Sequence, residues 1–182
     1  GRGQFFPLSQ SCSRSLAFLR VNLAKLTTAR LQLVSHEPEH LRALVRGTDF
    51  YERSSGMKAA IGLRDFVVSP DVSAEWRGAL ETASEADPWR FGFGLVHRES
   101  GFVIGNGGFA GPPDVNGFVE ISYGIVPDFE GKGFATEAAE ALIAYASADK
   151  RVRTIRAHTL PQPNASTRVL EKCGFRRTGE VD

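Results

Sequence analysis

The stretch of sequence that decides the fold is VEISYGIVPDFEGKGFATEAA, residues 119–139. Its β-branched and aromatic first part predicts a buried strand, the polar middle with Gly131 and Gly133 predicts a short turn, and the alanine-rich end predicts a helix. This order brings free backbone N–H groups and the positive end of a helix dipole to one point, where a phosphate group can bind. Glu120 is a lone carboxylate that we expect to be buried in the strand. The stretch therefore indicates an enzyme that holds a phosphorylated cofactor and removes a proton beside it.

The overall composition is that of an ordinary globular domain. The chain has 182 residues, which suits a single domain with a sizeable core. Its net charge of +1 argues against a dedicated nucleic-acid binder, because such proteins carry a strong basic excess. No apolar run approaches the roughly 18 residues that a membrane-spanning helix needs, so we expect no membrane partner.

Cysteine and histidine usage indicates a reducing compartment and no metal. The two cysteines, Cys12 and Cys173, lie far apart in sequence, so we expect free thiols and a cytoplasmic location rather than a disulfide. The four histidines are scattered, and Pro38 interrupts the i,i+4 pair of His36 and His40. We therefore predict no metal site.

The start of the chain differs in character from the rest. Residues 1–35 include several arginines and a lysine but no acid. This basic, serine-rich composition resembles a transit peptide, although a flexible leader or a stretch added by cloning is the simpler interpretation. We place a basic leader at 1–26 and one folded domain at 27–182.

Hydrophobic periodicity and turn residues predict a series of strands and helices. Helices are predicted to begin at Pro38 and to cover 73–84, 134–147 and 164–173, and strands to cover 29–35, 91–97, 102–109, 118–126, 154–160 and 175–181. Residues 47–70 give only weak helical signals. Three successive strands, followed by strand–helix–strand, predict an α/β fold with a mixed central sheet and helices on both faces.

Three separated motifs in this order resemble the GNAT superfamily of acyl-CoA-dependent N-acyltransferases. LTTARLQL (26–33) resembles the first strand of the branch that acetylates the N-termini of ribosomal proteins, EGKGFATEA (130–138) resembles the superfamily's diphosphate loop, and NASTRVLEKCGF (164–175) resembles its last helix. The resemblance spans roughly 27–181. It implies the GNAT acyl-CoA N-acyltransferase fold and acetyl-CoA as the acyl donor.

The resemblance implies that backbone amides of the diphosphate loop hold the cofactor. These amides belong to Gly131, Lys132, Gly133, Phe134, Ala135 and Thr136, and Lys132 would add a surface charge. The superfamily usually has Gln or Arg where this chain has Glu130, so we expect weaker affinity and a Glu130 side chain turned to solvent. A tight strand-to-helix turn without a ligand, or a ligand other than coenzyme A, is the alternative.

The resemblance also implies a second set of cofactor contacts. The strand 118–126 would splay from the strand 154–160, and unpaired backbone groups of Ile125 and Val126 would pair with the pantetheine arm as a false strand. Asn164 resembles the superfamily's asparagine at the cofactor, one residue later than usual. Arg168 lies one helical turn further and would reach a nucleotide phosphate, with a solvated arginine as the alternative.

Two residues are candidates for the chemistry. Glu120 occupies the position of a catalytic glutamate in similar acetyltransferases, and burial would raise its pKa and suit it to act as a general base; the alternative is a structural pair with an arginine on a neighbouring strand. The usual tyrosine acid is replaced by Leu170, so Ser166 would protonate the departing thiolate. The alternative for Ser166 is capping of the last helix.

We predict direct transfer of acetyl to a primary amine, without a covalent enzyme intermediate, because no side chain resembles an activated nucleophile. The acceptor pocket is expected between the first two helices and the hairpin 91–109, with Asn106, Phe109, Trp89 and Tyr123 as candidates. A protein N-terminal α-amine is the favoured acceptor. The alternatives are a small-molecule amine or a non-catalytic acyl-CoA-binding module.

The sequence ends before the family's final strand, so we expect a monomer or a homodimer that covers the exposed edge.

Overall fold

A mixed, strongly curved sheet forms the centre of the molecule. The computed structural model describes residues 4–5, 25–159 and 164–176. The strands follow the order β2 (Lys25–Thr27), β3 (Leu31–Ser35), β5 (Phe93–His97), β6 (Phe102–Phe109), β7 (Phe118–Ile125) and β8 (Thr154–Arg156). Neighbouring strands are antiparallel except β7 and β8, and the short β4 (Lys58–Ala59) runs parallel to β6.

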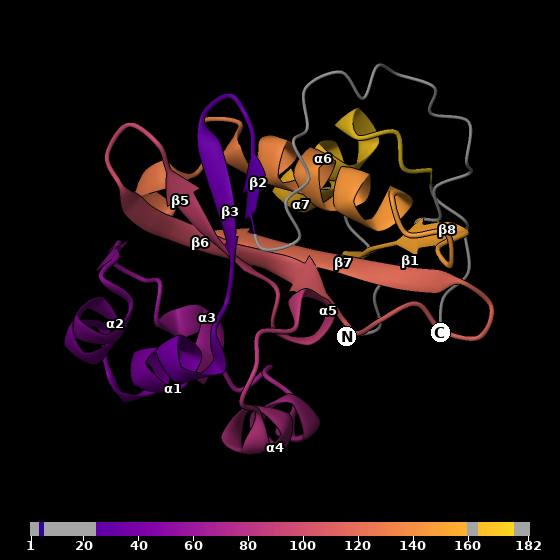
Figure 1. The fold of residues 1–182 in the computed structure, drawn as a ribbon. Helices are drawn as coiled ribbons and strands as arrows, with labels where there is room; N and C mark the ends of the chain where they lie inside the picture. Colours follow the sequence, from indigo (N-terminus) through magenta and orange to yellow (C-terminus); the bar gives the residue numbers. More distant parts are fainter. Residues whose placement is uncertain (1–3, 6–24, 160–163, 177–182) are drawn as a thin grey trace.

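Helices cover both faces of the sheet, as the sequence predicts. In Figure 1, α1 (Pro38–Arg46), α2 (Thr48–Ser55), α3 (Asp65–Val68) and α4 (Ala74–Thr82) lie on one side, and α6 (Phe134–Ser147) and α7 (Ala165–Lys172) lie on the other. The short α5 (Pro88–Phe91) leads into β5. Among the described residues, no helix is both long and apolar enough to cross a bilayer.

Local sequence signals explain where several helices begin. Pro38 occupies the first turn of α1, whose Leu41 and Leu44 are buried. The Ser73 hydroxyl accepts a hydrogen bond from the Trp76 N–H at 3.1 Å and thereby caps α4. These two predicted helices are confirmed. The weakly patterned 47–70 folds into α2, β4 and α3.

The edges of the sheet differ from the prediction. β2 begins at Lys25, so the sheet starts two residues before the predicted domain boundary. The predicted strand 154–160 is divided into β8 and β9 (His158–Thr159), and β9 pairs with β1 (Gln4–Phe5) instead of continuing beside β7. The predicted strand 175–181 lies mostly outside the described residues.

Small residues allow α6 to lie close to the sheet. Its inner face consists largely of buried alanines with Leu142 and Tyr145. A Cβ on Gly107 of β6 would lie only 3.1 Å from Leu142 Cδ1, so the glycine makes room for the helix. This contact holds α6 with its N-terminus at the end of β7. The phosphate-binding prediction depends on that placement.

A glycine contact between β6 and β7 should be essential for stability. A Cβ on Gly105 would lie 2.1 Å from the Gly124 carbonyl oxygen, a backbone atom that cannot rotate away. We expect Gly105→Ala to lower the free energy of unfolding by about 2 kcal/mol or more. Gly78 lies inside α4 with nothing within 4 Å of its Cβ position. Gly78→Ala should therefore stabilise by roughly 0.5–1 kcal/mol. Urea denaturation measures both, and equal effects would contradict the packing argument.

Candidate active site

The turn between β7 and α6 presents unbonded backbone N–H groups. After the 3₁₀ turn Pro127–Phe129, Gly131 and Gly133 adopt left-handed φ values of 71° and 85°, which glycine allows without steric cost. The first helical hydrogen bond of α6 runs from the Glu137 N–H to the Gly133 carbonyl. Within the described residues, the N–H groups of 131–136 donate to no protein acceptor. The predicted anion cradle is therefore available, and the dipole of α6 adds to it.

The loop carries two charged side chains, Glu130 and Lys132. Glu130 is exposed, as predicted. The Lys132 ammonium donates to the Asp128 carbonyl at 2.7 Å and lies 5.2 Å from the centre of the Phe129 ring. Its charge therefore sits against the preceding 3₁₀ turn, and the predicted contact of the Lys132 side chain with the cofactor gains no support from this geometry.

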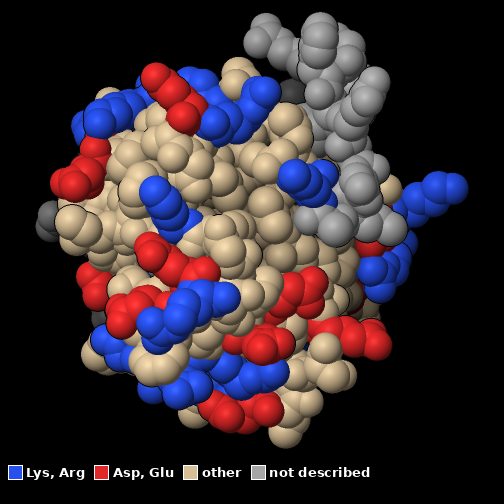
Figure 2. Space-filling view, turned by 60° about the vertical axis from the view of Figure 1, so that its left-hand side comes forward, with Lys and Arg blue, Asp and Glu red and all other residues tan. Residues whose placement is uncertain are grey.

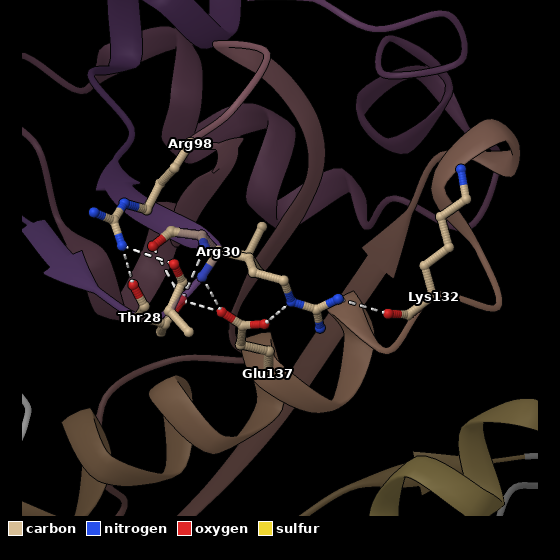
Figure 3. Close-up of polar contacts among 7 residues, drawn as sticks. Thr28, Arg30, Arg98, Lys132 and Glu137 are labelled. Atoms are coloured by element: carbon tan, nitrogen blue, oxygen red, sulfur yellow. Dashed lines mark hydrogen bonds and ion pairs between the residues drawn. The ribbon is translucent and has the colours of Figure 1, made fainter.

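A cluster around Glu137 ties the turn between β2 and β3 to the start of α6 (Figure 3). The Thr28 hydroxyl and the Arg30 N–H both donate to Glu137 Oε1, at 2.5 and 2.7 Å, and Arg30 Nε donates to Oε2 at 2.8 Å. Partial burial alone would raise the pKa of Glu137, but these hydrogen bonds outweigh it and lower the pKa. From the other side, Arg98 Nη1 donates to the Thr28 and Ala29 carbonyls. We call Thr28, Arg30, Arg98 and Glu137 the turn clamp.

β7 and β8 separate, as predicted for a pantetheine slot. They pair only from Phe118 to Glu120, and among the described residues β7 has no partner on this side beyond Glu120. The Glu120 carbonyl accepts from the N–H of Ala110, directly after β6, and the Val126 N–H donates to Ile104 of β6. Because successive residues of a strand alternate in direction, the backbone groups of Tyr123 and Ile125 face the opening.

The structure therefore distinguishes the two predicted backbone contacts. Ile125 lies where its N–H and C=O can pair with a ligand in the opening. Val126 differs, because its N–H is bonded to the Ile104 carbonyl at 2.8 Å and its own carbonyl accepts from the Phe129 N–H at 3.0 Å. The prediction of unpaired groups at Val126 is wrong, because β6 uses its N–H and the 3₁₀ turn that follows β7 uses its carbonyl.

Glu120 lies at the closed end of this opening, but it is not buried. Its side chain is 34% exposed and forms an ion pair with the His158 imidazole, through Nδ1. The expectation of a buried carboxylate is therefore wrong, because the strand pairing that would cover it stops at this residue. The partner is also a histidine of β9, not an arginine. No local pattern in the sequence indicates His158.

Ser166 faces the opening from the opposite element. Asn164, not Ser166, caps α7: its Oδ1 accepts from the Thr167 N–H at 3.0 Å, and it also bonds Thr159 Oγ1. The capping alternative for Ser166 is therefore wrong. Ser166 Oγ lies 3.3 Å from the Tyr123 hydroxyl, whose pKa is raised by burial. Arg168 is exposed on α7, so its phosphate contact stays a prediction.

A cavity of about 680 Å³ lies beside the opening. It is lined by α1, α3, α4, α5 and the central parts of β6 and β7, as the sequence predicts for the acceptor pocket. Asn106, Phe109 and Tyr123 line it. Trp89 instead stacks on Phe109 and Tyr145, with ring centroids 4.5 and 5.3 Å apart, and belongs to the core.

The cavity contains a buried imidazole that the sequence analysis did not single out for function. His36 Nε2 lies 3.0 Å from Asn106 Oδ1, and burial lowers the pKa of His36 to about 4. The imidazole is therefore neutral at physiological pH and acts as a hydrogen-bonding group.

Burial raises the pKa of the Cys173 thiol to about 12, which makes it a poor nucleophile. Across the described residues, no group of three or more His, Cys, Asp or Glu could hold a metal ion.

Comparison with known proteins identifies the family. The family described as "Acetyltransferase (GNAT) domain" matches residues 30–176, so the protein belongs to the GNAT acetyltransferases. The chain is 35% identical over 81 residues to the uncharacterized N-acetyltransferase YjdG of Bacillus subtilis (strain 168), a match that covers 44% of this chain and 48% of YjdG. It thus spans about half the length of the curated relatives it matches.

Solved structures share the fold. The ribosomal-protein-S5-alanine acetyltransferase of Vibrio fischeri superposes with a TM-score of 0.54 at 13% identity, over 85% of this chain and 84% of its own. The microcin C7 self-immunity acetyltransferase MccE, solved with acetyl-CoA and AMP, gives a TM-score of 0.55 at 16% identity, over 84% and 82%. The family's acyl donor is acetyl-CoA, and the unbonded amides of 131–136 beside an open strand edge fit its diphosphate and amide-rich arm.

The turn clamp should make stability depend on pH. Because the pKa of Glu137 is lowered on folding, the clamp stabilises the protein above the ordinary glutamate pKa of about 4.3 and loses this contribution as the pH falls through the folded value. We expect Glu137→Gln to destabilise at pH 7, and its difference from wild type to shrink towards pH 3. Glu140→Gln, on the exposed side of α6, is the control. Urea denaturation between pH 7 and 3 measures this, and a pH-independent difference would contradict it.

Proposed function

We propose that the protein transfers the acetyl group of acetyl-CoA to a primary amine, with a protein N-terminal α-amine as the favoured acceptor. The observation that carries the proposal is the set of unbonded N–H groups at 131–136 where β7 meets α6. These amides would hold the diphosphate, and the backbone of Ile125 and Tyr123 would hold the pantetheine arm in the opening. Acetyl-CoA supplies the acetyl group as a thioester.

The reacting groups would meet at the closed end of the opening. The amine nitrogen enters from the cavity and forms a bond to the acetyl carbon as the carbon–sulfur bond breaks. Glu120 receives the proton that the amine loses, directly or through a water molecule, with His158 beside it. Ser166, hydrogen-bonded to Tyr123, donates a hydrogen bond to the departing thiolate, which then takes up a proton from water as coenzyme A leaves.

The exposure of Glu120 supports an acceptor of low pKa. The Glu120 carboxylate is 34% exposed and bonded to His158, so water can reach it and carry the proton of an amine that is already partly neutral. An α-amine of pKa about 7.7–8.0 is roughly one-tenth neutral at pH 7, whereas a lysine of pKa about 10.4 is neutral about once in 2,500 molecules. The fold neighbour from Vibrio fischeri, named as a ribosomal-protein-S5-alanine acetyltransferase, belongs to the favoured class.

A small-molecule amine is the second candidate acceptor. A cavity of about 680 Å³ is of the size that binds small ligands. A turnover screen with acetyl-CoA over peptides with free and blocked N-termini, polyamines and aminoglycosides separates the two acceptors. Turnover only with free N-termini supports the favoured acceptor. Coenzyme A binding without turnover on any amine would support a non-catalytic module.

Removing the carboxylate of Glu120 should abolish most of the turnover. General bases contribute about 10²–10⁴-fold, so we expect Glu120→Gln to lower kcat by about 100-fold or more. Calorimetry should show coenzyme A binding within about twofold of wild type, because the glutamine keeps the side chain's shape. Glu99→Gln, in the exposed β5–β6 hairpin, is the control. Unchanged kcat in Glu120→Gln would exclude this residue as the base.

The hydroxyl pair of Tyr123 and Ser166 should act as one hydrogen-bond-donating unit. We expect Tyr123→Phe and Ser166→Ala each to lower kcat by about tenfold or more. The double variant should be only slightly worse than either single one, since each change breaks the same hydrogen bond. Thiol release at saturating acetyl-CoA measures this. Independent, multiplicative losses would show that the two hydroxyls act separately.

A further inference from the structure

The turn clamp brings a cation to the diphosphate loop from a distant part of the chain. Arg30, in the turn between β2 and β3, donates from Nη1 to the Lys132 carbonyl at 2.9 Å. Its guanidinium stacks 4.5 Å from the centre of the Phe134 ring. A Cβ on Gly133 would lie 3.3 Å from Arg30 Nη2. The guanidinium therefore contacts three consecutive residues of the loop.

The hydrogen bond to Lys132 fixes the direction of one free amide. In a trans peptide unit, the C=O of one residue and the N–H of the next point in opposite directions. Because Arg30 holds the Lys132 carbonyl on the clamp side, the Gly133 N–H points away from the clamp. That N–H is one of those with no acceptor among the described residues. Glu137 in turn holds Arg30 through Nε and the backbone N–H, so the guanidinium has a fixed position (Figure 3).

The local charge balance makes this cation important. The loop itself contributes the carboxylate of Glu130, and Figure 3 shows the Lys132 side chain directed away from Arg30. The net charge is only +1, and on the face in Figure 2 acidic and basic side chains are interspersed. Arg30 is a cation that lies against the loop, and its ion pair with Glu137 holds the guanidinium there.

We infer that Arg30 is a positioning residue for the diphosphate of coenzyme A. By holding the Lys132 carbonyl, Arg30 orients the Gly133 amide towards the diphosphate, while Glu137 fixes the guanidinium and offsets its charge. This inference rests on the proposed binding of acetyl-CoA at 131–136, and it extends the site to a turn 102 residues earlier in the chain.

Arg98 offers a matched control. It holds the same turn by donating to the Thr28 and Ala29 carbonyls, both at 2.8 Å, and its N–H donates to the Arg30 carbonyl at 2.9 Å. Among the described residues, Arg98 forms no hydrogen bond or ion pair with the diphosphate loop, and Figure 3 places it on the far side of the turn. A purely structural role of the clamp would therefore affect Arg30 and Arg98 variants alike.

The test measures coenzyme A affinity by calorimetry for wild type, Arg30→Gln, Arg30→Lys and Arg98→Gln, with thermal melting as the measure of folding. We expect Arg30→Gln to weaken coenzyme A binding about tenfold and to raise the KM for acetyl-CoA with kcat nearly unchanged. Arg30→Lys should lose less, because lysine keeps the charge but not the fork that joins Glu137 to Lys132. Arg98→Gln should bind within about twofold of wild type, even if it melts earlier.

A second probe separates phosphate recognition from loosening of the whole site. Inhibition by pantetheine, which has no phosphate, should be the same in wild type and Arg30→Gln. Equal coenzyme A affinity of wild type and Arg30→Gln, or equal losses in Arg30→Gln and Arg98→Gln, would overturn the inference and leave the proposed function intact. Should Arg30→Gln not fold, Arg30→Lys with wild-type affinity would overturn it. A wild-type protein that binds no coenzyme A would overturn the proposed function itself.

Discussion

The site depends on two left-handed glycines at the end of β7. Gly131 and Gly133 let the chain turn sharply into α6, and the turn leaves the amides of 131–136 without internal acceptors. Everything else in the fold serves to place this turn. Alanines on α6 and glycines on β6 let the helix lie close to the sheet, and the separation of β7 from β8 opens the slot that leads from the turn to Glu120. In the proposed function, the acyl donor is therefore bound largely by backbone groups, which Arg30 helps to orient.

Two glutamates show how similar residues acquire different roles. Each is a carboxylate in a largely apolar element, Glu120 in β7 and Glu137 in α6. Glu137 accepts hydrogen bonds from Thr28 and Arg30 and holds a distant turn, and its pKa is lowered as a result. Glu120 bonds the His158 imidazole and lies where the pairing of β7 with β8 ends. Periodicity in the sequence places both on their elements, but only the tertiary contacts decide which carboxylate remains available for chemistry.

The same distinction separates what the sequence predicts from what it misses. Strands, helices and the diphosphate loop follow from periodicity, glycines and caps, which are local signals, and these predictions are confirmed for the central sheet, α4 and α6. The misses are contacts between residues far apart in the chain: His158 with Glu120, Tyr123 with Ser166, and Arg30 with the loop. Val126 is a miss of another kind, because its N–H continues the pairing with β6 and its carbonyl closes a 3₁₀ turn that the sequence analysis did not predict.

The acceptor side differs physically from the donor side, because side chains rather than backbone groups define it. Within the cavity, the His36–Asn106 pair is neutral and can only form hydrogen bonds, since burial keeps the imidazole unprotonated. The exposed side chains that line the cavity include two carboxylates, Asp71 and Glu75, and one cation, Arg90. An acceptor that arrives charged and carries hydrogen-bonding groups next to its amine suits this combination. A peptide N-terminus has both properties, with an amide directly beside the amine, whereas a polyamine carries charge without the carbonyl. These cavity features are compatible with the proposed α-amine acceptor.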